Sequence, residues 1–546
     1  MKAPDTRMRW WGWGVDSDAM HLPASAQAMV EQGLGVKERP PARVSIEQIQ
    51  LPEPTLDGEL RARFVQIVGE DGLRQDLAAR VSHSVGRSYP DLLKVRAGQV
   101  QNAPDVVVYP AGHEQVRALL EACSQADAAI VPFGGGTSVV GGVEPERRGF
   151  ASLVSLDLAR MSSLLEVDQV SLTARLEPGM TGPEAEQALN ARGLTLGHFP
   201  QSYEYATIGG YAATRSAGQA STGYGRIDEV ILGLRLAAPA GDVEVAPHPG
   251  SAAGPALREL VVGSEGTLGV ITEVTVAVRP LPEVRQYEGW SFKSFQAGVE
   301  AFREMEQAHA SGDVSRLSDE AETQMSLASA GDSGGSATKL ARRWLKLRGH
   351  EHGCIAIVGF EGERDEVADR ANRARILLRA AGGLRLGKRP GAAWQKQRFR
   401  APYLRDELLD RGVMVETLET ATSWSNLQRL HAAVAGALRA ALTERGTPPV
   451  VMCHVSHLYP SGASLYFSFI AAQQRGQEME QWRAAKSAAS DAIIAAGGTI
   501  THHHAIGRDH APWMRAEVGE LGIELLRAAK ERLDPRGMMN PGKLIP

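Results

Sequence analysis

The chain is poor in cysteine: its 546 residues include only Cys123, Cys354 and Cys453. An odd number at wide spacing excludes a disulfide framework and a zinc knuckle, and it suits a reducing compartment. No stretch approaches about 18 uninterrupted apolar residues, which excludes a membrane-spanning helix. The start of the chain also lacks the apolar segment and cleavage site of a secretory signal. We therefore expect a cytoplasmic protein whose lone cysteines lie in the core.

The chain also lacks a strong excess of charge. Lys and Arg number 59 against 64 Asp and Glu, for a formal net charge of −5. This balance carries no nucleic-acid footprint, so nucleic acid is excluded as a partner and an anionic ligand would need individual arginines. A chain of this length exceeds one hydrophobic core, so we expect two or more domains around a shared site.

Hydrophobic periodicity predicts the elements that surround a glycine-rich loop. A strand, a helix and a strand are expected over residues 106–133, from apolar runs flanking residues at i, i+3, i+4 and i+7. Alternation predicts a strand at 170–176 with one face formed by Val170, Leu172, Ala174 and Leu176. The last fifty residues are expected to contain a strand, a turn and a helix.

Glycine, by contrast, is abundant and clustered. The segment VPFGGGTSVVGG, residues 131–142, directly follows the second of these strands. Glycine permits positive φ and close approach, so such a loop can turn several backbone N–H groups toward one anion, and a pyrophosphate is the natural guest. The segment fits neither GxxxxGK[ST] nor GxGxxG, which excludes a P-loop and a Rossmann start. The competing interpretation is a tight turn.

Two later segments favour a cofactor over a turn. Residues 198–225 and 263–274 are again rich in small residues, and each adjoins β-like sequence. Three such loops suggest one extended cofactor.

These segments, in this order, resemble the vanillyl-alcohol-oxidase-type FAD-binding flavoproteins, and most of all the alkyldihydroxyacetonephosphate synthase subgroup. The resemblance runs from MRWWGWG at 8–14 to the C-terminus. It implies FAD as the cofactor, noncovalently bound, because Phe133 in the glycine loop cannot form a covalent flavin bond. It implies FAD contacts at Pro132, Phe133, Gly134, Gly135, Gly136, Thr137, Ser138, Gln201, Ser202, Thr207, Gly209, Gly210, Thr214, Arg215, Ser216, Ala217, Gly263, Glu265, Gly266, Thr267, Gly269, Val270 and Ile271.

The resemblance also implies the reacting groups. Tyr466 matches the family's catalytic tyrosine, and His502, His503 and His504 its histidine triplet. Arg405 matches the arginine for the substrate phosphate and Arg316 a further active-site and substrate arginine. Arginine suits phosphate because its planar fork of donors grips two oxygens at once.

The activity implied is a transferase reaction that forms an ether-lipid precursor. It exchanges the acyl group of acyl-dihydroxyacetone phosphate for a fatty alcohol through an adduct at flavin N5, with no net redox change. The alternative is an FAD-dependent oxidoreductase of a 2-hydroxy acid or related alcohol, which shares the fold and the NPG ending. A lipid substrate makes peripheral membrane association plausible. A homodimer is also possible.

The three consecutive histidines leave open a metal site, a solvated cluster, or groups that handle protons or phosphate. We favour the last, with His503 central and no metal expected, because no carboxylate spacing such as HExxH accompanies them. If 500–505 is extended, His502 and His504 share one face and His503 points to the other. Two departures from the family's pattern are Gln201, where an acid is usual, and the loop at 322–338.

The expected fold class is α+β, an FAD-binding domain of vanillyl-alcohol-oxidase type with an α+β substrate domain. We predict an N-terminal, partly helical arm at 1–99, the FAD domain at 100–282, a cap at 283–495, and a return to the FAD domain at 496–546. The boundary near 282 rests on Pro280-Leu281-Pro282.

Overall fold

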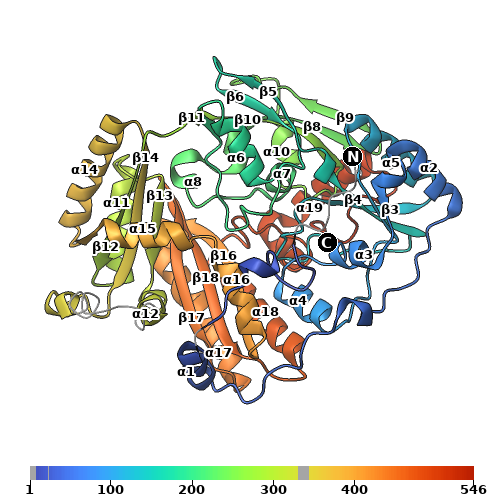
Figure 1. The fold of residues 1–546 in the computed structure, drawn as a ribbon. Helices are drawn as coiled ribbons and strands as arrows, with labels where there is room; N and C mark the ends of the chain where they lie inside the picture. Colours follow the sequence, from blue (N-terminus) through green and yellow to red (C-terminus); the bar gives the residue numbers. More distant parts are fainter. Residues whose placement is uncertain (1–7, 23, 330–342) are drawn as a thin grey trace.

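The computed structural model describes residues 8–22, 24–329 and 343–546. The fold is α+β, as predicted, and its two sheet-containing parts lie side by side in Figure 1. One part, blue to green, holds a four-stranded and a five-stranded sheet; the other, yellow to orange, holds a seven-stranded sheet. The red C-terminal segment lies against the first part.

The four-stranded sheet carries the first glycine-rich loop. Its order is β1 (Leu73–Arg74), β2 (Val106–Val108), β4 (Ser152–Asp157) and β3 (Ala128–Phe133), with β2, β4 and β3 parallel. Helix α5 (His113–Gln125) connects β2 to β3, which confirms the predicted strand, helix and strand. Parallel strands require such a crossover helix. The glycine loop therefore leaves the carboxyl end of β3.

The five-stranded sheet is antiparallel throughout. Its order is β5 (Leu164–Asp168), β6 (Thr173–Leu176), β10 (Val270–Ala277), β8 (Ile231–Ala238) and β9 (Gly241–Val245). A separate pair joins β7 (Leu194–Thr195) and β11 (Arg279–Pro280). The strand expected at 170–176 is shorter than predicted: Val170 is 96% exposed in the β5–β6 turn, and Leu172 has φ +52°. A two-residue-period pattern cannot distinguish a strand from the turn that precedes it.

The seven-stranded antiparallel sheet presents two unlike faces. Its order is β15 (Leu384–Gly387), β12 (Val284–Phe292), β14 (Cys354–Gly362), β13 (Val314–Ser318), β17 (Val450–Tyr459), β18 (Gly462–Ala472) and β16 (Val413–Ser423). Helices α11 (Phe295–Gln307), α14 (Arg364–Ala380), α17 (Leu427–Glu444) and α18 (Glu478–Ala495) share its largest apolar core. Because side chains alternate along a strand, every second residue points to the other face.

The remaining named helices cover the two parts and connect them. In the first part they are α2 (Gly58–Val68), α3 (Leu77–Ser82), α4 (Tyr89–Arg96), α6 (Gly182–Asn190), α7 (Ile208–Thr214), α8 (Ser221–Tyr224), α9 (Ile227–Val230) and α10 (Leu257–Val261). The others are α1 (Ala24–Leu34), α12 (Glu320–Ser329), α15 (Lys388–Gln397), α16 (Ala401–Leu409) and α19 (Met514–Leu533). None of the described helices is long and apolar enough to cross a membrane.

The C-terminal segment returns to the four-stranded sheet. The Ile130 N–H donates to the Met538 carbonyl at 2.8 Å, and the Asn540 N–H donates to the Ile130 carbonyl at 2.7 Å. This segment contains α19 but, over residues 496–546, only an isolated bridge at Met539 in place of the predicted strand. Met539 is the one residue of this segment that pairs with a strand, opposite Ile130, so no strand of two or more residues forms among the described residues. The division at residues 100, 283 and 496 remains a prediction; the seven-stranded sheet begins at Val284, whereas β1, from the predicted arm, pairs within the four-stranded sheet.

The cysteines, the start of the loop at 322–338 and the N-terminal arm are also placed by the structure. The three cysteines are free and buried, as predicted. The loop expected at 322–338 begins with α12, so its first eight residues are helical, and 330–338 lie outside the described residues. In the N-terminal arm Trp13 is 3% exposed, but Trp11 lies among the guanidinium groups of Arg9, Arg43 and Arg96. The arm is therefore anchored by cation–π contacts as well as by apolar burial.

Candidate active site

Four polar side chains share the face of the seven-stranded sheet that lies opposite its apolar core. They come from the adjacent strands β13, β17, β18 and β16 and are Arg316, His454, Tyr466 and Glu419. Tyr466 lies opposite both Glu419 and His454 in the ladder. Its chain neighbours Leu465 and Phe467 are fully buried in the core. The period of two thus brings residues from distant parts of the chain together.

Glu419 organises the histidine segment. Its buried carboxylate accepts the backbone N–H groups of His502, His503 (3.1 Å) and His504 (2.7 Å), and the Thr501 hydroxyl (2.6 Å). One carboxylate can accept three consecutive N–H groups only if the backbone curves around it. The segment is therefore bent rather than extended, and the predicted alternation of the histidines is wrong. Sequence analysis did not single out Glu419, whose only signal was its place in the strand LETATS.

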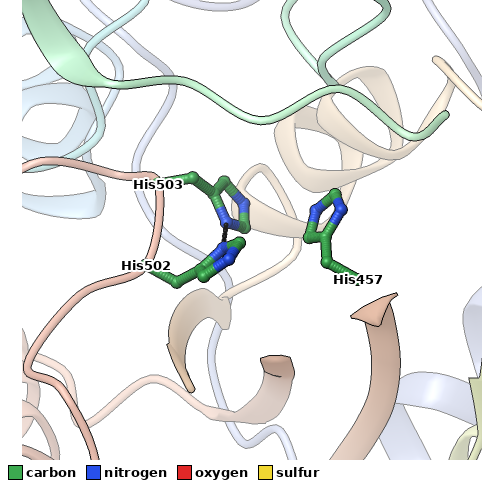
Figure 2. Close-up of side chains that lie close together, drawn as sticks. All are labelled: His457, His502 and His503. Atoms are coloured by element: carbon green, nitrogen blue, oxygen red, sulfur yellow. Dashed lines mark hydrogen bonds between the residues drawn. The ribbon is translucent and has the colours of Figure 1, made fainter. Parts of the chain in front are cut away.

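The histidine side chains form a hydrogen-bonded row instead. His502 Nδ1 lies 2.9 Å from His503 Nδ1, and His502 Nε2 lies 2.6 Å from the Tyr459 hydroxyl. His457 stacks on His502 with ring centroids 5.0 Å apart. Figure 2 shows these three imidazoles facing one another.

A β-bulge aims His457 at this group. Val455 pairs with Leu465, but Leu458 pairs with Ala463, so β17 contains one extra residue. A bulge of this kind re-aims the side chains that follow it. Without it, the two-residue period would turn His457 toward the apolar core, as it does Val455.

The same trio is the metal-capable histidine group found in the described part of the chain, with ring nitrogens within 4.8 Å of one another. Both nitrogens of His502 already have partners in His503 and Tyr459. A metal ligand would have to give up one of those bonds. The arrangement favours the proton-handling interpretation, and the expectation of no metal remains a prediction.

Burial sets the protonation states of the site. Burial lowers the pKa of His502 and His503, and it lowers the pKa of His504 to about 3. Burial opposes a charge on Glu419, but the adjacent imidazoles and the Thr501 bond outweigh it and hold its pKa well below the usual range. Burial raises the pKa of Tyr466 to about 12. At neutral pH the imidazoles are neutral and the tyrosine keeps its proton.

Tyr466 lies between two histidine groups. Its ring stacks on His454 at 4.9 Å and on His503 at 5.9 Å between centroids. His504 meets it edge-on at 5.4 Å. The structure therefore brings together the predicted tyrosine and the histidine triplet.

Arg316 lies behind this group. Its guanidinium contacts His454 Nε2 at 2.9 Å and Glu322 at 2.6 Å. The arginine thus fixes the imidazole on which Tyr466 stacks, and its donors are directed at those two residues. Its predicted role in substrate binding is untested, and these contacts indicate a positioning role.

Arg405 lies on α16, in a cluster of arginines around Asp406. Its Nη1 donates to the Arg87 carbonyl at 2.6 Å, while its buried Nε and Nη2 have no hydrogen-bond partner among the described residues. Arg87 is also buried, and its Nε has no such partner. Asp406, held by Arg9 at 2.9 Å and by the Trp13 N–H at 2.6 Å, is the carboxylate at its centre. Buried arginine donors without partners are costly, so this cluster suits an anion.

The three glycine-rich loops converge. A Cβ at Gly135 would lie 2.0 Å from the Tyr205 carbonyl, so only glycine fits where the first loop meets the second. Gly266, at φ +73°, brings the third loop against Pro132 of the first, where a Cβ would lie 2.9 Å from the ring. The loops therefore line one continuous surface.

Glu265 ties the third loop to the histidine segment. Its carboxylate accepts the N–H groups of Ile506 (2.9 Å) and Gly507 (2.8 Å). The second loop is a neighbour as well: burial, with smaller contributions from Arg226 and His503, lowers the pKa of His198 to about 3. His198 Nε2 in turn lies 2.7 Å from Ser216 Oγ. The third loop thus contacts the histidine segment, and the second loop lies close to His503.

The chemistry of this surface fits a dinucleotide. The glycines present backbone at close range, and buried polar atoms without a partner among the described residues include Gln201 Nε2 and Ser264 Oγ. Other residues predicted to contact FAD support the loops: Thr207 caps α7 through Gly210 N (3.2 Å), and Ser138 Oγ accepts Gly142 N (3.0 Å). Arg215 caps the end of α7 and pairs with Glu259.

Comparisons with known proteins agree with this site. Residues 104–246 match the family model described as FAD binding domain, and residues 281–544 match FAD linked oxidases, C-terminal domain. FAD is thus the cofactor of this protein.

Known proteins also match this chain along most of its length. The chain is 35% identical over 499 residues to the alkyldihydroxyacetonephosphate synthase of Dictyostelium discoideum, which covers 90% of this chain and 81% of that protein. It is 35% identical over 506 residues to the enzyme of that name from Trypanosoma brucei brucei, covering 91% and 82%. A solved alkyldihydroxyacetonephosphate synthase structure, 30% identical, matches with a TM-score of 0.85 over 99% of each chain.

Proposed function

Because the chain belongs to the alkyldihydroxyacetonephosphate synthase family of FAD-dependent proteins, we propose that it exchanges the acyl group of acyl-dihydroxyacetone phosphate for a fatty alcohol. The product is an ether-lipid precursor. The single observation that carries this proposal is the row of Tyr466 and the histidines on Glu419, beside the converging FAD loops.

The glycine-rich loops would hold the cofactor. Gly134, Gly135 and Gly136 present backbone for the diphosphate, since a helix-like or glycine-rich turn can direct several N–H groups at one anion. The segment from Gln201 to Ala217 would face the flavin ring. Bound FAD supplies the reactive ring position at which this family's exchange takes place.

Arg405 would bind the substrate phosphate. Its buried Nε and Nη2 make no hydrogen bond, although Nη2 lies 3.8 Å from Asp406 Oδ1, so they can donate in parallel to two phosphate oxygens. Arg87, beside it, adds a second buried cation. A dianionic phosphate would compensate the charge of both.

His503 and Tyr466 would handle the protons. A neutral imidazole can take the proton of the attacking alcohol, and a phenol whose pKa is about 12 can donate a hydrogen bond to the departing carboxylate. Arg316 would act through His454, by fixing the ring against which Tyr466 packs. Positioned acid–base groups contribute about 10²–10⁴-fold to rate.

Two features of the cellular setting belong to the same proposal. A lipid substrate calls for peripheral contact with a membrane surface from the cytoplasm. A homodimer is the proposed assembly; the exposed Leu521 and Leu525, one turn apart on α19, support it.

The decisive experiment incubates the purified protein with acyl-dihydroxyacetone phosphate and labelled hexadecanol. We expect labelled ether and released fatty acid in equal amounts, with the flavin absorbance unchanged at the end. Arg405→Gln should raise the KM for the phosphate-bearing substrate about tenfold or more, since a lost charged hydrogen bond costs about 1.5–3 kcal/mol. Arg439→Gln, on the exposed face of α17, is the matched control.

The alternative makes the opposite prediction. Anaerobic bleaching of the flavin by a 2-hydroxy acid, with no ether formed, would identify an oxidoreductase and overturn the transferase proposal. Equal KM values for Arg405→Gln and the control would remove Arg405 from the phosphate site.

A further inference from the structure

A cavity of about 430 Å³ lies where the first part of the molecule meets the β17–β18 hairpin. Residues 221–225 of α8 and its C-cap line one side, and Leu458, Tyr459 and Pro460 line the other. The cavity is partly open to solvent, and its lining mixes polar and apolar atoms, with the polar ones in moderate excess. These residues are not among those proposed to hold FAD or the substrate phosphate.

Tyr459 belongs both to this cavity and to the histidine row. Its hydroxyl lies 2.6 Å from His502 Nε2, and His502 Nδ1 lies 2.9 Å from His503 Nδ1. Both distances lie within the normal range of hydrogen bonds. Beyond His503 the row reaches Tyr466, on which the His503 ring stacks. A hydrogen-bonded chain of exchangeable protons thus runs from His503 through His502 to Tyr459, which lines the cavity.

The hydrogen-bonded row of His503, His502 and Tyr459 has only two consistent arrangements of its protons. One N–H must lie between the two Nδ1 atoms, so one imidazole donates there and the other accepts. If His503 donates, then His502 accepts at Nδ1, donates from Nε2 to the Tyr459 oxygen, and leaves the Tyr459 O–H for the cavity. His503 Nε2 is then free to accept a proton from the reaction.

We propose that His503, His502 and Tyr459 form a proton relay that moves the proton of the attacking alcohol from the reaction site to water in this cavity. The inference rests on the proposed exchange reaction. It assigns Tyr459 a role in proton delivery that its position in a hairpin does not suggest.

The step balances in atoms and charge. The alcohol O–H bond breaks as its oxygen forms the new ether bond to carbon, and the carboxylate departs with the electron pair of its own C–O bond. The alcohol proton goes to His503 Nε2, the Nδ1 proton passes to His502, the His502 Nε2 proton passes to Tyr459, and the Tyr459 proton passes to water. No electron is transferred to an acceptor.

The surroundings keep a proton from resting on the relay. Burial lowers the pKa of His502 and His503; the Glu419 carboxylate opposes this effect, and the Arg226 guanidinium adds to it, with a net lowering of both. The same guanidinium bonds to Tyr459 and partly offsets the burial that raises the pKa of this phenol to about 12. Burial thus outweighs the Glu419 carboxylate, so both imidazoles rest in the neutral form and can pass a proton on.

The test removes only the hydroxyl, with Tyr459→Phe, in the FAD-loaded enzyme. Tyr224→Phe is the matched control, because Tyr224 lines the same cavity but bonds to Glu361 at 2.9 Å rather than to a histidine. For Tyr459→Phe we expect kcat to fall roughly tenfold to a hundredfold, with both KM values unchanged. Added imidazole should restore part of the rate, because a small base can replace a missing proton carrier, and the control should stay within about twofold of wild type.

An unchanged kcat in Tyr459→Phe, or a loss that imidazole does not restore, would overturn the relay. If the wild-type protein itself shows no exchange, the proposed function fails, and nitrogen NMR of labelled histidines then tests the relay alone. The relay requires His502 and His503 neutral at pH 7, with His502 signals that shift in Tyr459→Phe and not in Tyr224→Phe. A charged imidazole, or no shift, would rule it out.

Discussion

A single buried carboxylate decides the shape of the histidine segment. Glu419 has no exposed side-chain surface, and its bonds to three successive N–H groups convert a run of histidines into a curved, hydrogen-bonded row. Charged acceptors make the stronger hydrogen bonds in proteins. The arrangement of His502, His503 and His504 therefore depends on a residue more than 80 positions away in the chain.

Replacing Glu419 with glutamine tests this dependence. The neutral amide offers one acceptor oxygen and places an NH₂ group against backbone donors, so we expect the free energy of unfolding to fall by about 3 kcal/mol. Urea unfolding followed by circular dichroism measures it. Glu244→Gln, on exposed β9, is the control and should change stability by less than about 0.5 kcal/mol. Equal midpoints for the two variants would contradict the assigned role.

The buried histidines also predict how stability depends on pH. His504 and His510 each have a folded-state pKa lowered by burial to about 3, whereas an unfolded histidine titrates near 6.5. The unfolded chain therefore binds protons between these values that the folded chain refuses. Stability is fully present above about pH 6.5 and is lost as pH falls, by about 1.4 kcal/mol per pH unit for each histidine.

Urea unfolding of wild type and His504→Gln between about pH 7 and pH 5 checks this slope. The variant should lose stability less steeply, because one proton-binding group of the unfolded state has been removed. Identical slopes would show that His504 is not held neutral by burial.

At the scale of elements, the loop after β3 depends on a close approach between segments. Gly135 packs so near the Tyr205 carbonyl that a methyl group cannot be accommodated without separating the first two cofactor loops. The bulge in β17 also acts through backbone geometry. Its extra residue turns His457 and Tyr459 to the face opposite the apolar core. Both devices act by backbone geometry rather than by side-chain chemistry.

Gly135→Ala tests the first device. Overpacking costs about 1–3 kcal/mol, so we expect FAD affinity to fall about tenfold or more, measured as flavin absorbance per chain after desalting. Gly436→Ala is the control, since a Cβ there meets nothing within 4 Å. Full FAD content in Gly135→Ala would show that the loops can separate without loss of the site.

At the scale of the whole molecule, the N-terminal arm closes over the arginine cluster. Trp13 packs with Met8 and Tyr403, and its backbone N–H donates to Asp406 at 2.6 Å, next to Arg405. The arm thus connects the start of the chain to α16, across some 390 residues of sequence. Its tryptophans contribute to the proposed phosphate site by holding the carboxylate that orients the arginines.

Trp13→Ala should lower the free energy of unfolding by about 3–5 kcal/mol, as expected for truncating a buried aromatic residue, and raise the KM for the phosphate-bearing substrate. Trp13 also packs edge-on against Tyr205 of the second glycine-rich loop, with ring centroids 5.7 Å apart, so some loss of FAD is expected together with the rise in KM. Thermal unfolding and steady-state kinetics measure the two effects. The control is Trp344→Ala, whose ring is 38% exposed. A variant that loses FAD but keeps its KM would contradict this placement.

The sequence by itself determined the local elements and the family. Glycine positions, periodic apolar residues and the order of the cofactor segments predicted the strand, helix and strand at 106–133, the FAD loops and the α+β class, because these depend on local backbone preferences. The strand expected at 170–176 was longer than the observed one for the same reason: alternation continues into a turn.

Only the tertiary structure decided how the reacting groups meet. It curved the histidine segment around Glu419, placed Arg316 behind Tyr466, left Arg405 with unpaired donors, and brought Tyr459 between His502 and a cavity. These contacts join residues far apart in the chain, and they follow from strand register and burial. A linear pattern records neither of these.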